Sequence, residues 1–252
     1  MAKIAIITGA TGGLGQAFVT EVLKENIDEI WAVARNTDRL GVLKEQNERI
    51  RPVRCDLSDA DDLEKLFGLI KSEHPEIRLL INNAGIGQMG LSTELSASDI
   101  TKTIDINCKA VCLLCGQSVP YMSKGSRILN ISSASSFQPV PYLNLYASSK
   151  VFVRSYSRAL NAELKNKGII CTAVCPGWID TDMLKKEYNG KTVRFPGILS
   201  AQRVAEQALR DSAAGRDMSV CGAYVKYEHI LSKLLPQKLI MKIWLNGIRK
   251  YI

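Results

Sequence analysis

A glycine-rich loop directly after a short apolar strand is the feature that most constrains this chain. We expect a strand at Lys3–Thr8, buried on both faces, and a helix at Gly15–Glu25. Such a loop lets backbone N–H groups approach a pyrophosphate at the positive end of a helix. Glycines also mark ordinary tight turns, so it is the strand before and the helix after that favour a dinucleotide site. The loop reads Thr8-Gly9-Ala10-Thr11-Gly12-Gly13-Leu14-Gly15.

The spacing of these glycines fits two patterns. One is Gly-x-x-x-Gly-x-Gly through Gly9, Gly13 and Gly15. The other is Gly-x-x-Gly-x-x-Gly through Gly9, Gly12 and Gly15. The residues alone leave both patterns open.

The rest of the chain alternates short apolar runs with longer stretches of helical periodicity. The expected strands are Lys3–Thr8, Glu29–Ala34, Arg51–Cys55, Leu79–Asn82, Arg127–Ser132, Ile169–Cys175 and Ser219–Ala223. The expected helices are Gly15–Glu25, Asp59–Ser72, Ser98–Met122, Tyr146–Lys167 and Ala201–Ala213, with Ser58 and Ser200 as N-caps and Gly168 as a C-cap. This alternation predicts an α/β fold: a Rossmann-type doubly wound parallel sheet of about seven strands with helices on both faces. We expect one NAD(P)-binding domain over residues 1–252.

Composition excludes several classes of protein. Of the 252 residues, 46% are hydrophobic and 23% are charged, which excludes a disordered or fibrous chain. The formal net charge is +8, but outside the C-terminus the basic residues are scattered, so no nucleic-acid partner is expected. Seven Cys are too sparse for a disulfide scaffold, and two His offer little for a metal site. Without a signal peptide or an apolar run long enough to span a membrane, we expect a cytoplasmic protein with reduced thiols and no metal.

The end of the second strand predicts the choice of cofactor. An acidic residue there would bond the ribose 2′-hydroxyl of NAD, whereas an arginine can hold the 2′-phosphate of NADP. Here the strand runs into Ala34-Arg35-Asn36, and no carboxylate comes before Asp38. The planar fork of Arg35 suits a phosphate, so we expect NADP(H) rather than NAD(H). The alternative is that Arg35 is a solvated surface residue.

A second set of polar residues lies in the middle of the chain. Tyr146 and Lys150 are four residues apart and share a helix face, and Ser133 follows the preceding strand. Asn107 lies in the helix expected at Ser98–Met122. Each of these has an ordinary structural explanation when taken singly, but their joint occurrence with the glycine loop predicts catalysis. The fourth and sixth strands run into Asn82-Asn83-Ala84-Gly85 and Pro176-Gly177.

Taken in order from Lys3 to about Tyr224, these motifs resemble the short-chain dehydrogenase/reductase family, in its single-domain branch. The resemblance implies a catalytic tetrad of Asn107, Ser133, Tyr146 and Lys150. The second glycine pattern resembles the family's extended branch, whose longer C-terminal substrate domain we do not expect here. NADP-preferring members often carry a basic residue in the glycine loop, where this sequence has Thr11 and Gly12. The implied cofactor contacts are Thr8, Gly9, Thr11, Gly12, Gly13, Leu14, Gly15, Arg35, Asn36, Asp56, Leu57, Asn83, Ala84, Gly85, Tyr146, Lys150, Pro176, Gly177, Ile179 and Thr181.

The implied tetrad suits hydride transfer to a ketone. That reaction leaves an oxyanion, which must receive a proton from a placed acid, and Tyr146 is the candidate. A free tyrosine titrates near pH 10, so we expect a pKa lowered by roughly 2–3 units by the charges of Lys150 and of an oxidised nicotinamide. Ser133 would donate a hydrogen bond to the same substrate oxygen. Asn107 would hold a water or a backbone group near Lys150.

The loops expected around Tyr146 are mostly apolar, which predicts a small-molecule substrate with a bulky apolar body. We expect a ketone or secondary alcohol and an activity like that of hydroxysteroid dehydrogenases or carbonyl reductases. The alternatives are a 3-oxoacyl thioester reductase and a non-catalytic NADP-sensing or scaffold protein. The candidate substrate contacts are Gln88, Met89, Phe137, Val140, Pro141, Tyr142, Leu143, Trp178, Met183 and Leu184.

Two further features concern contacts outside the site. The helices expected at Ser98–Met122 and Tyr146–Lys167 carry more apolar side chains than one sheet face needs, and the resemblance implies a homodimer or homotetramer. Residues 227–252 form a basic amphipathic extension in which Pro236 starts a helix. Three roles are open for this extension: a lid over an apolar substrate, a subunit contact, or a membrane-surface contact, which is the least favoured.

Overall fold

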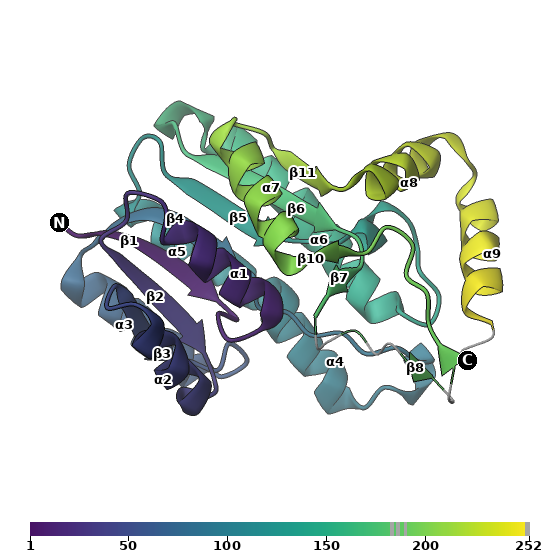
Figure 1. The fold of residues 1–252 in the computed structure, drawn as a ribbon, viewed down its shortest axis with the longest axis horizontal. Coiled ribbons are helices and arrows are strands. Elements are labelled where there is room, and N and C mark those ends of the chain that lie inside the picture. Colours follow the sequence, from purple (N-terminus) through teal and green to yellow (C-terminus); the bar gives the residue numbers. More distant parts are fainter. Residues whose placement is uncertain (182–183, 185–186, 189–190, 250–252) are drawn as a thin grey trace.

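The computed structural model describes residues 1–181, 184, 187–188 and 191–249. Its centre is a seven-stranded sheet in the order β11-β6-β5-β4-β1-β2-β3, with every neighbouring pair parallel (Figure 1). From β1 the chain runs to one edge through β2 and β3, then crosses back to β4 and continues to the other edge. This is the doubly wound Rossmann-type order, so the predicted fold class is confirmed. The strands are β1 (Lys3–Thr8), β2 (Glu29–Ala34), β3 (Ile50–Arg54), β4 (Glu76–Asn82), β5 (Arg127–Ile131), β6 (Ile170–Pro176) and β11 (Met218–Cys221).

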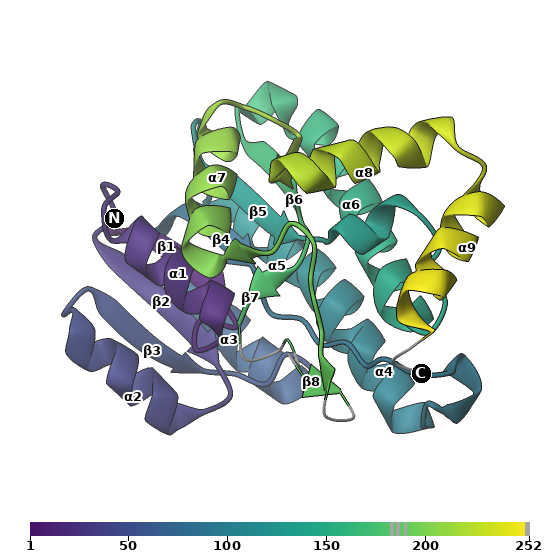
Figure 2. The ribbon, with the colours of Figure 1, turned by 45° about the vertical axis from the view of Figure 1, so that its right-hand side comes forward.

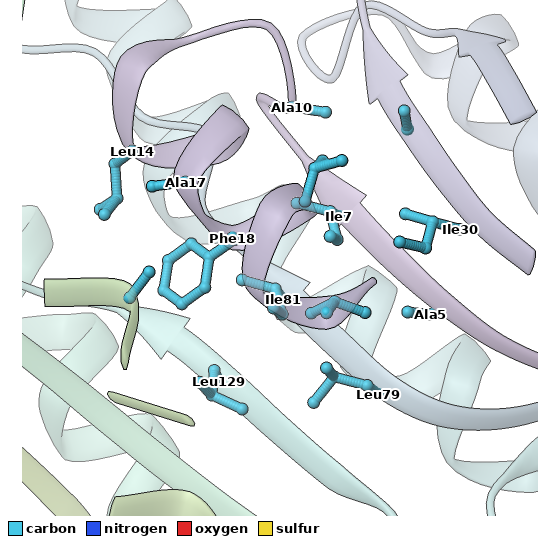
Figure 3. Packing of buried hydrophobic residues seen from close by; sticks show 14 of the residues in the cluster. Ala5, Ile7, Ala10, Leu14, Ala17, Phe18, Ile30, Leu79, Ile81 and Leu129 are labelled. Carbon is cyan, nitrogen blue, oxygen red and sulfur yellow. The ribbon is translucent and has the colours of Figure 1, made fainter. Parts of the chain in front are cut away.

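Helices cover both faces of the sheet (Figure 2). Alternate side chains of β1 point to opposite faces: Ala5 and Ile7 join one buried cluster, and Ile4 and Ile6 join the other. Figure 3 shows the first cluster, in which Phe18 packs over the sheet. The helices are α1 (Gly13–Val22), α2 (Thr37–Gln46), α3 (Ala60–Glu73), α4 (Ala97–Ile104), α5 (Ala110–Ser118), α6 (Asn144–Glu163), α7 (Ala201–Ala213), α8 (Ala223–Leu234) and α9 (Gln237–Ile248).

Four very short strands follow β6 and were not expected from the sequence. β7 (Ile179–Asp180) pairs in parallel with β10 (Leu199–Ser200), and β8 (Glu187–Tyr188) pairs antiparallel with β9 (Lys191–Thr192). Two residues are too few to show the alternation of side chains by which a strand is recognised in a sequence.

The prediction of one continuous helix at Ser98–Met122 is wrong. This segment is divided into α4 and α5 by a π-helical turn at Asp105–Lys109, and a 3₁₀ turn at Val119–Tyr121 follows. A π-turn inserts an extra residue into the α-helical ladder and often marks a functional position. Here the turn contains Asn107, which is fully buried.

Smaller differences concern the ends of elements. Ser58 does not cap α3, because Asp59 does so by accepting a hydrogen bond from the Asp62 N–H at 3.0 Å. The expected cap Ser200 is confirmed. The helix expected to end at Lys167 stops at Glu163, and Gly168, left-handed at φ 65°, caps the 3₁₀ turn Lys165–Lys167 that follows it. The strand expected to end at Ala223 stops at Cys221, where Gly222 turns the chain into the unexpected helix α8.

Candidate active site

A cleft of about 410 Å³ lies at the carboxyl ends of the parallel strands. Ligands of doubly wound sheets bind at this edge, beside the point where the strand order reverses. The loops that follow β1 to β6 all contribute to the walls of the cleft. Most residues expected at the site line it: Gly9, Thr11, Gly12, Gly13, Leu14, Gly15, Arg35, Asp56, Leu57, Asn83, Ala84, Gly85, Ser133, Tyr146, Lys150, Pro176, Gly177, Ile179 and Thr181.

The glycine loop is packed too tightly for side chains at three of its four glycines. Gly9 has a φ of +64°, and a Cβ on Gly15 would stand 2.1 Å from the Gly9 carbonyl oxygen. A Cβ on Gly13 would meet Thr181 at 2.7 Å, whereas one on Gly12 would meet only ordinary contact at 3.5 Å. Close packing therefore falls on Gly9, Gly13 and Gly15, in agreement with the first of the two spacing patterns.

Thr8 lies behind this loop rather than in the cleft and joins β1 to the loop after β4. Its Oγ1 accepts hydrogen bonds from the N–H groups of Asn83 at 3.0 Å and Ala84 at 3.1 Å. The Asn83 Nδ2 donates in return to the carbonyl oxygens of Thr8 at 3.0 Å and Gly9 at 3.2 Å. These bonds hold two loops of the cleft at a fixed separation.

Arg35 and Asp56 face each other at the end of the cleft beside β2 and β3. The Arg35 Nη1 lies 3.8 Å from the Asp56 Oδ2, and the arginine side chain is 64% exposed. Burial alone would raise the pKa of Asp56, but hydrogen bonds from Ser58 and the charge of Arg35 hold it below its ordinary value. Asn36 does not line the cleft. Its Oδ1 accepts from the Arg39 N–H at 2.8 Å and caps α2.

Ser133, Tyr146 and Lys150 meet at the other end of the cleft. Ser133 follows β5 and caps a 3₁₀ turn, accepting a hydrogen bond from the Ser135 N–H at 3.1 Å. Tyr146 and Lys150 are one turn apart on α6, and the Lys150 Nζ lies 5.5 Å from the centre of the tyrosine ring. The Nζ also donates to the Ile131 carbonyl oxygen at 2.8 Å.

Asn107 lies beneath this group and holds the chain after β4. Its Oδ1 accepts from the Ile86 N–H at 2.9 Å, and its Nδ2 donates to the Ile86 carbonyl oxygen at 2.8 Å. The same Nδ2 donates to the Ser149 Oγ at 2.9 Å, which ties the chain to α6. A Cβ on Gly85 would stand 3.1 Å from the Lys150 Nζ and 3.4 Å from the Asn107 Oδ1, so both side chains flank Gly85. Asn107 thus holds a backbone group near Lys150.

A lowered pKa at Tyr146 was expected from the charges of Lys150 and of an oxidised nicotinamide, and for that complex it stays a prediction. Burial raises the pKa of Tyr146 above its ordinary value, and a hydrogen bond with Ser133 offsets this only in part. Lys150 is only 3% exposed, and burial lowers its pKa from 10.5 to about 8. The sequence shows the charge of Lys150 but not the burial of Tyr146 and Lys150, which disfavours the charged form of both side chains.

The candidate substrate contacts divide into three groups. Leu143, Trp178 and Leu184 line the cleft. Phe137 and Val140 are instead buried in the fold. Gln88 and Met89 are exposed, Pro141 and Tyr142 are half-buried outside the cleft lining, and Met183 lies outside the described residues.

One close contact of Tyr146 was missed in the sequence. A Cβ on Gly87 would stand 2.6 Å from the tyrosine ring, so the ring packs directly on the Gly87 backbone. The run Gly85-Ile86-Gly87 after the fourth strand carried that signal, because closely spaced glycines mark a close backbone approach. Seven other lining residues were also missed, and all except Ser132 are apolar: Val33, Ala34, Cys55, Ile86, Ile106, Ile131 and Ser132.

Residues 3–192 match the family model for short chain dehydrogenases. The chain belongs to the short-chain dehydrogenase/reductase family. The family comprises oxidoreductases that act between alcohol and carbonyl groups and use a nicotinamide nucleotide. The reversed strand order and the glycine loop at its cleft agree with this assignment.

Curated relatives of this short-chain dehydrogenase have several activities. It is 36% identical over 194 residues to a very-long-chain 3-oxoacyl-CoA reductase of Anas platyrhynchos, a match that covers 72% of this chain and 61% of the relative. It is 31% identical over 216 residues to a 3beta-hydroxysteroid dehydrogenase of Mediterraneibacter gnavus, covering 83% of this chain and 78% of the relative.

Solved structures agree in fold. A short-chain dehydrogenase from Sphingobium yanoikuyae, in complex with NADPH, superposes with a TM-score of 0.77 at 24% identity, covering 95% of both chains. The bulky-bulky ketone specific alcohol dehydrogenase from Comamonas testosteroni gives a TM-score of 0.74 at 25% identity, covering 95% of this chain and 94% of that one.

The buried ammonium of Lys150 leads to a prediction about stability and pH. Because its pKa is about 8 in the fold and 10.5 in the unfolded chain, the unfolded chain binds more protons between these values. The wild type should therefore gain stability relative to Lys150→Met as the pH rises through this window, by on the order of 3 kcal/mol in total. Urea unfolding of both proteins from neutral to alkaline pH measures the difference. A difference that stays constant with pH would contradict a charged, buried Lys150.

Proposed function

We propose that this chain is an NADP(H)-dependent oxidoreductase that interconverts a ketone and a secondary alcohol on a bulky apolar substrate. The observation that carries the proposal is the grouping of Ser133, Tyr146 and Lys150 at one end of a cleft that has Arg35 at its other end. The proposed reacting groups and the proposed phosphate site therefore lie apart in the cleft. The proposed catalytic set is completed by Asn107.

The cleft fits a nicotinamide dinucleotide. Its glycine loop lines the cleft, with Gly13 facing Thr181, and the N–H groups at the start of α1 suit a pyrophosphate. Arg35 would hold a 2′-phosphate, and the half-buried Asn83, Ala84 and Gly85 would flank the nucleotide beside β4. Solved neighbours in complex with NADPH or NADP support this preference, although other neighbours are in complex with NADH or NAD. When bound, the reduced nucleotide supplies the hydride.

The residues of the chain supply the proton and the positioning. Tyr146 donates a proton to the carbonyl oxygen as negative charge develops on it. Ser133 donates a hydrogen bond to the same oxygen and fixes its position. The ammonium of Lys150, one helical turn away, favours the phenolate that Tyr146 leaves behind. Asn107 keeps the Ile86 backbone in place beside these groups.

The apolar walls formed by Leu143, Trp178 and Leu184 favour a substrate with a large apolar body. We therefore propose hydroxysteroid dehydrogenase-like activity, supported by the 3beta-hydroxysteroid dehydrogenase among the relatives. The second candidate is a 3-oxoacyl thioester reductase, because other relatives are very-long-chain 3-oxoacyl-CoA reductases. Assaying steroids, simple ketones and 3-oxoacyl thioesters in parallel with NADPH separates the two. Turnover of none of them would favour a non-catalytic protein.

We also propose a homodimer or homotetramer built on α4, α5 and α6. These helices expose five large apolar side chains on the described surface. Such a stripe suits a two-fold contact, in which the same patch of both subunits meets. The side chains are Ile100, Ile104, Leu113, Val151 and Phe152.

Tyr146→Phe tests the proposed acid. The variant removes the hydroxyl but keeps the ring that packs on Gly87, so kcat should fall by roughly 10²–10⁴ while NADPH binding is unchanged. Initial rates and a fluorescence titration with NADPH measure the two effects. Tyr142→Phe is the matched control, since Tyr142 is a half-buried tyrosine four residues earlier that does not line the cleft. Turnover near the wild-type rate in pure Tyr146→Phe would remove Tyr146 from the mechanism.

The choice of cofactor is tested by Arg35→Leu. A hydrogen bond to a charged group contributes roughly 1.5–3 kcal/mol, so the wild type should prefer NADPH over NADH by about 10- to 150-fold in kcat/KM. We expect the lower part of this range, because Asp56 shares the charge of Arg35 and the glycine loop has no basic residue. Arg35→Leu should abolish the preference, and adding Ala34→Asp should reverse it.

Arg39→Leu is the control for this series, since Arg39 lies on α2 outside the cleft lining. Its ratio of NADPH to NADH rates should equal that of the wild type. The assignment of Arg35 to the 2′-phosphate is wrong if the wild type prefers NADH or if Arg35→Leu leaves the ratio unchanged.

A further inference from the structure

Helices α8 and α9 form the end of the molecule remote from β3 and α2 in both views (Figures 1 and 2). Their inner sides are anchored to the fold. On α8, Val225 is 1% exposed, and the His229 ring lies 4.2 Å from the ring of Phe137. On α9, the Trp244 Nε1 donates to the Pro141 carbonyl oxygen at 2.9 Å, and Ile240 is buried. The two helices are therefore docked parts of the fold.

The outer sides of the same helices are apolar and open. Tyr227, Ile230 and Leu234 follow one another at helical spacing on α8, with exposures of 58%, 55% and 73%. On α9, Leu239 and Ile243 are one turn apart, with exposures of 44% and 57%. We call these five side chains the outer apolar face.

The charges that accompany the outer apolar face are nearly all positive. All the basic residues described on α8 and α9 and at the end of α9 are exposed, and Glu228 is the only acidic residue between Ala223 and Arg249. Glu228 is half-buried, and burial raises the pKa of its carboxyl. The exposed cations are Lys226, Lys233, Lys238, Lys242 and Arg249, whereas Lys250 lies outside the described residues.

The combination of exposed apolar side chains and positive charges indicates which partner fits the outer apolar face. The inner sides already touch the loop that contains Pro141, so a lid role leaves the outer apolar face unused. A second copy joined by a two-fold contact would bring together two patches that both carry a net positive charge. An anionic lipid surface instead matches the cations and accepts the apolar side chains. Within the described residues, no helix is long and apolar enough to cross a membrane.

We propose that α8 and α9 bind the surface of an anionic lipid bilayer, with the outer apolar face in the headgroup region and the lysines on the headgroup charges. The contact lies close to the cleft, because Trp244 also stacks on Trp178, a cleft residue, with ring centres 6.5 Å apart. An apolar substrate of the proposed kind could then enter from the lipid. The lipid contact itself does not depend on the proposed function.

Sedimentation with vesicles tests this contact on the full chain. The wild type should bind vesicles of phosphatidylcholine mixed with phosphatidylserine, bind phosphatidylcholine alone weakly, and lose binding as salt is added. The pair Ile230→Ser with Leu234→Ser removes apolar contact without changing charge, and Lys238→Gln with Lys242→Gln removes charge alone. Each pair should lower the partition coefficient by about tenfold or more.

Matched controls come from the opposite end of the molecule. Val42→Ser on α2 removes an apolar side chain that is 58% exposed, and Lys44→Gln with Lys71→Gln removes two exposed lysines from α2 and α3. These variants should bind vesicles like the wild type, and the circular dichroism of every variant checks the fold. No wild-type binding to anionic vesicles, or binding by either α8–α9 pair equal to that of the wild type, overturns the proposal. A lower mass in light scattering for Ile230→Ser with Leu234→Ser would instead identify a subunit contact.

Discussion

The hydrogen bonds between Thr8 and Asn83 are the interaction on which the cleft depends. β1 and β4 are neighbours in the sheet, yet their chains separate where the strand order reverses, so the polar groups of the backbone there lose their partners in the sheet. Thr8 accepts from the N–H groups of Asn83 and Ala84, and the Asn83 side chain donates to two carbonyl oxygens across the gap. The buried Thr8 and the half-buried Asn83 thereby keep the two loops at a fixed distance, which sets the width of the cleft. The glycine loop and the wall that carries Gly85 keep one relative position as a result.

At the proposed catalytic end of the cleft, two features lower the stability of the fold. Lys150 is buried with a pKa near 8, and its ammonium is held by the Ile131 carbonyl oxygen. Asn107 occupies a π-turn, where it holds Ile86 through two hydrogen bonds. A buried charge and an interrupted helix are features that a sequence selected for stability alone would avoid. Their presence around Tyr146 agrees with a functional role for this end of the cleft.

Much of this could be predicted from the sequence because the signals are local. The run Lys3–Thr8 and the glycines after it indicated both the strand and the close packing of the loop. The π-turn had no local signal in the sequence, and the contact that its Asn107 makes is with Ile86, 21 residues away. The burial that raises the pKa of Tyr146 could not be predicted either, because burial is a property of the folded chain. The outer apolar face was also hidden, since the sequence shows that Leu234 and Ile243 are apolar but not that they are exposed.

We propose that one cleft binds the nucleotide and the reacting carbonyl group side by side. A crystal structure of the chain with NADP⁺ and an unreactive ketone tests this claim most directly. We expect the 2′-phosphate at Arg35, the pyrophosphate at the glycine loop, and the ketone oxygen within hydrogen-bonding distance of both Tyr146 and Ser133. A nucleotide bound elsewhere, or a ketone oxygen out of reach of Tyr146, would contradict the account.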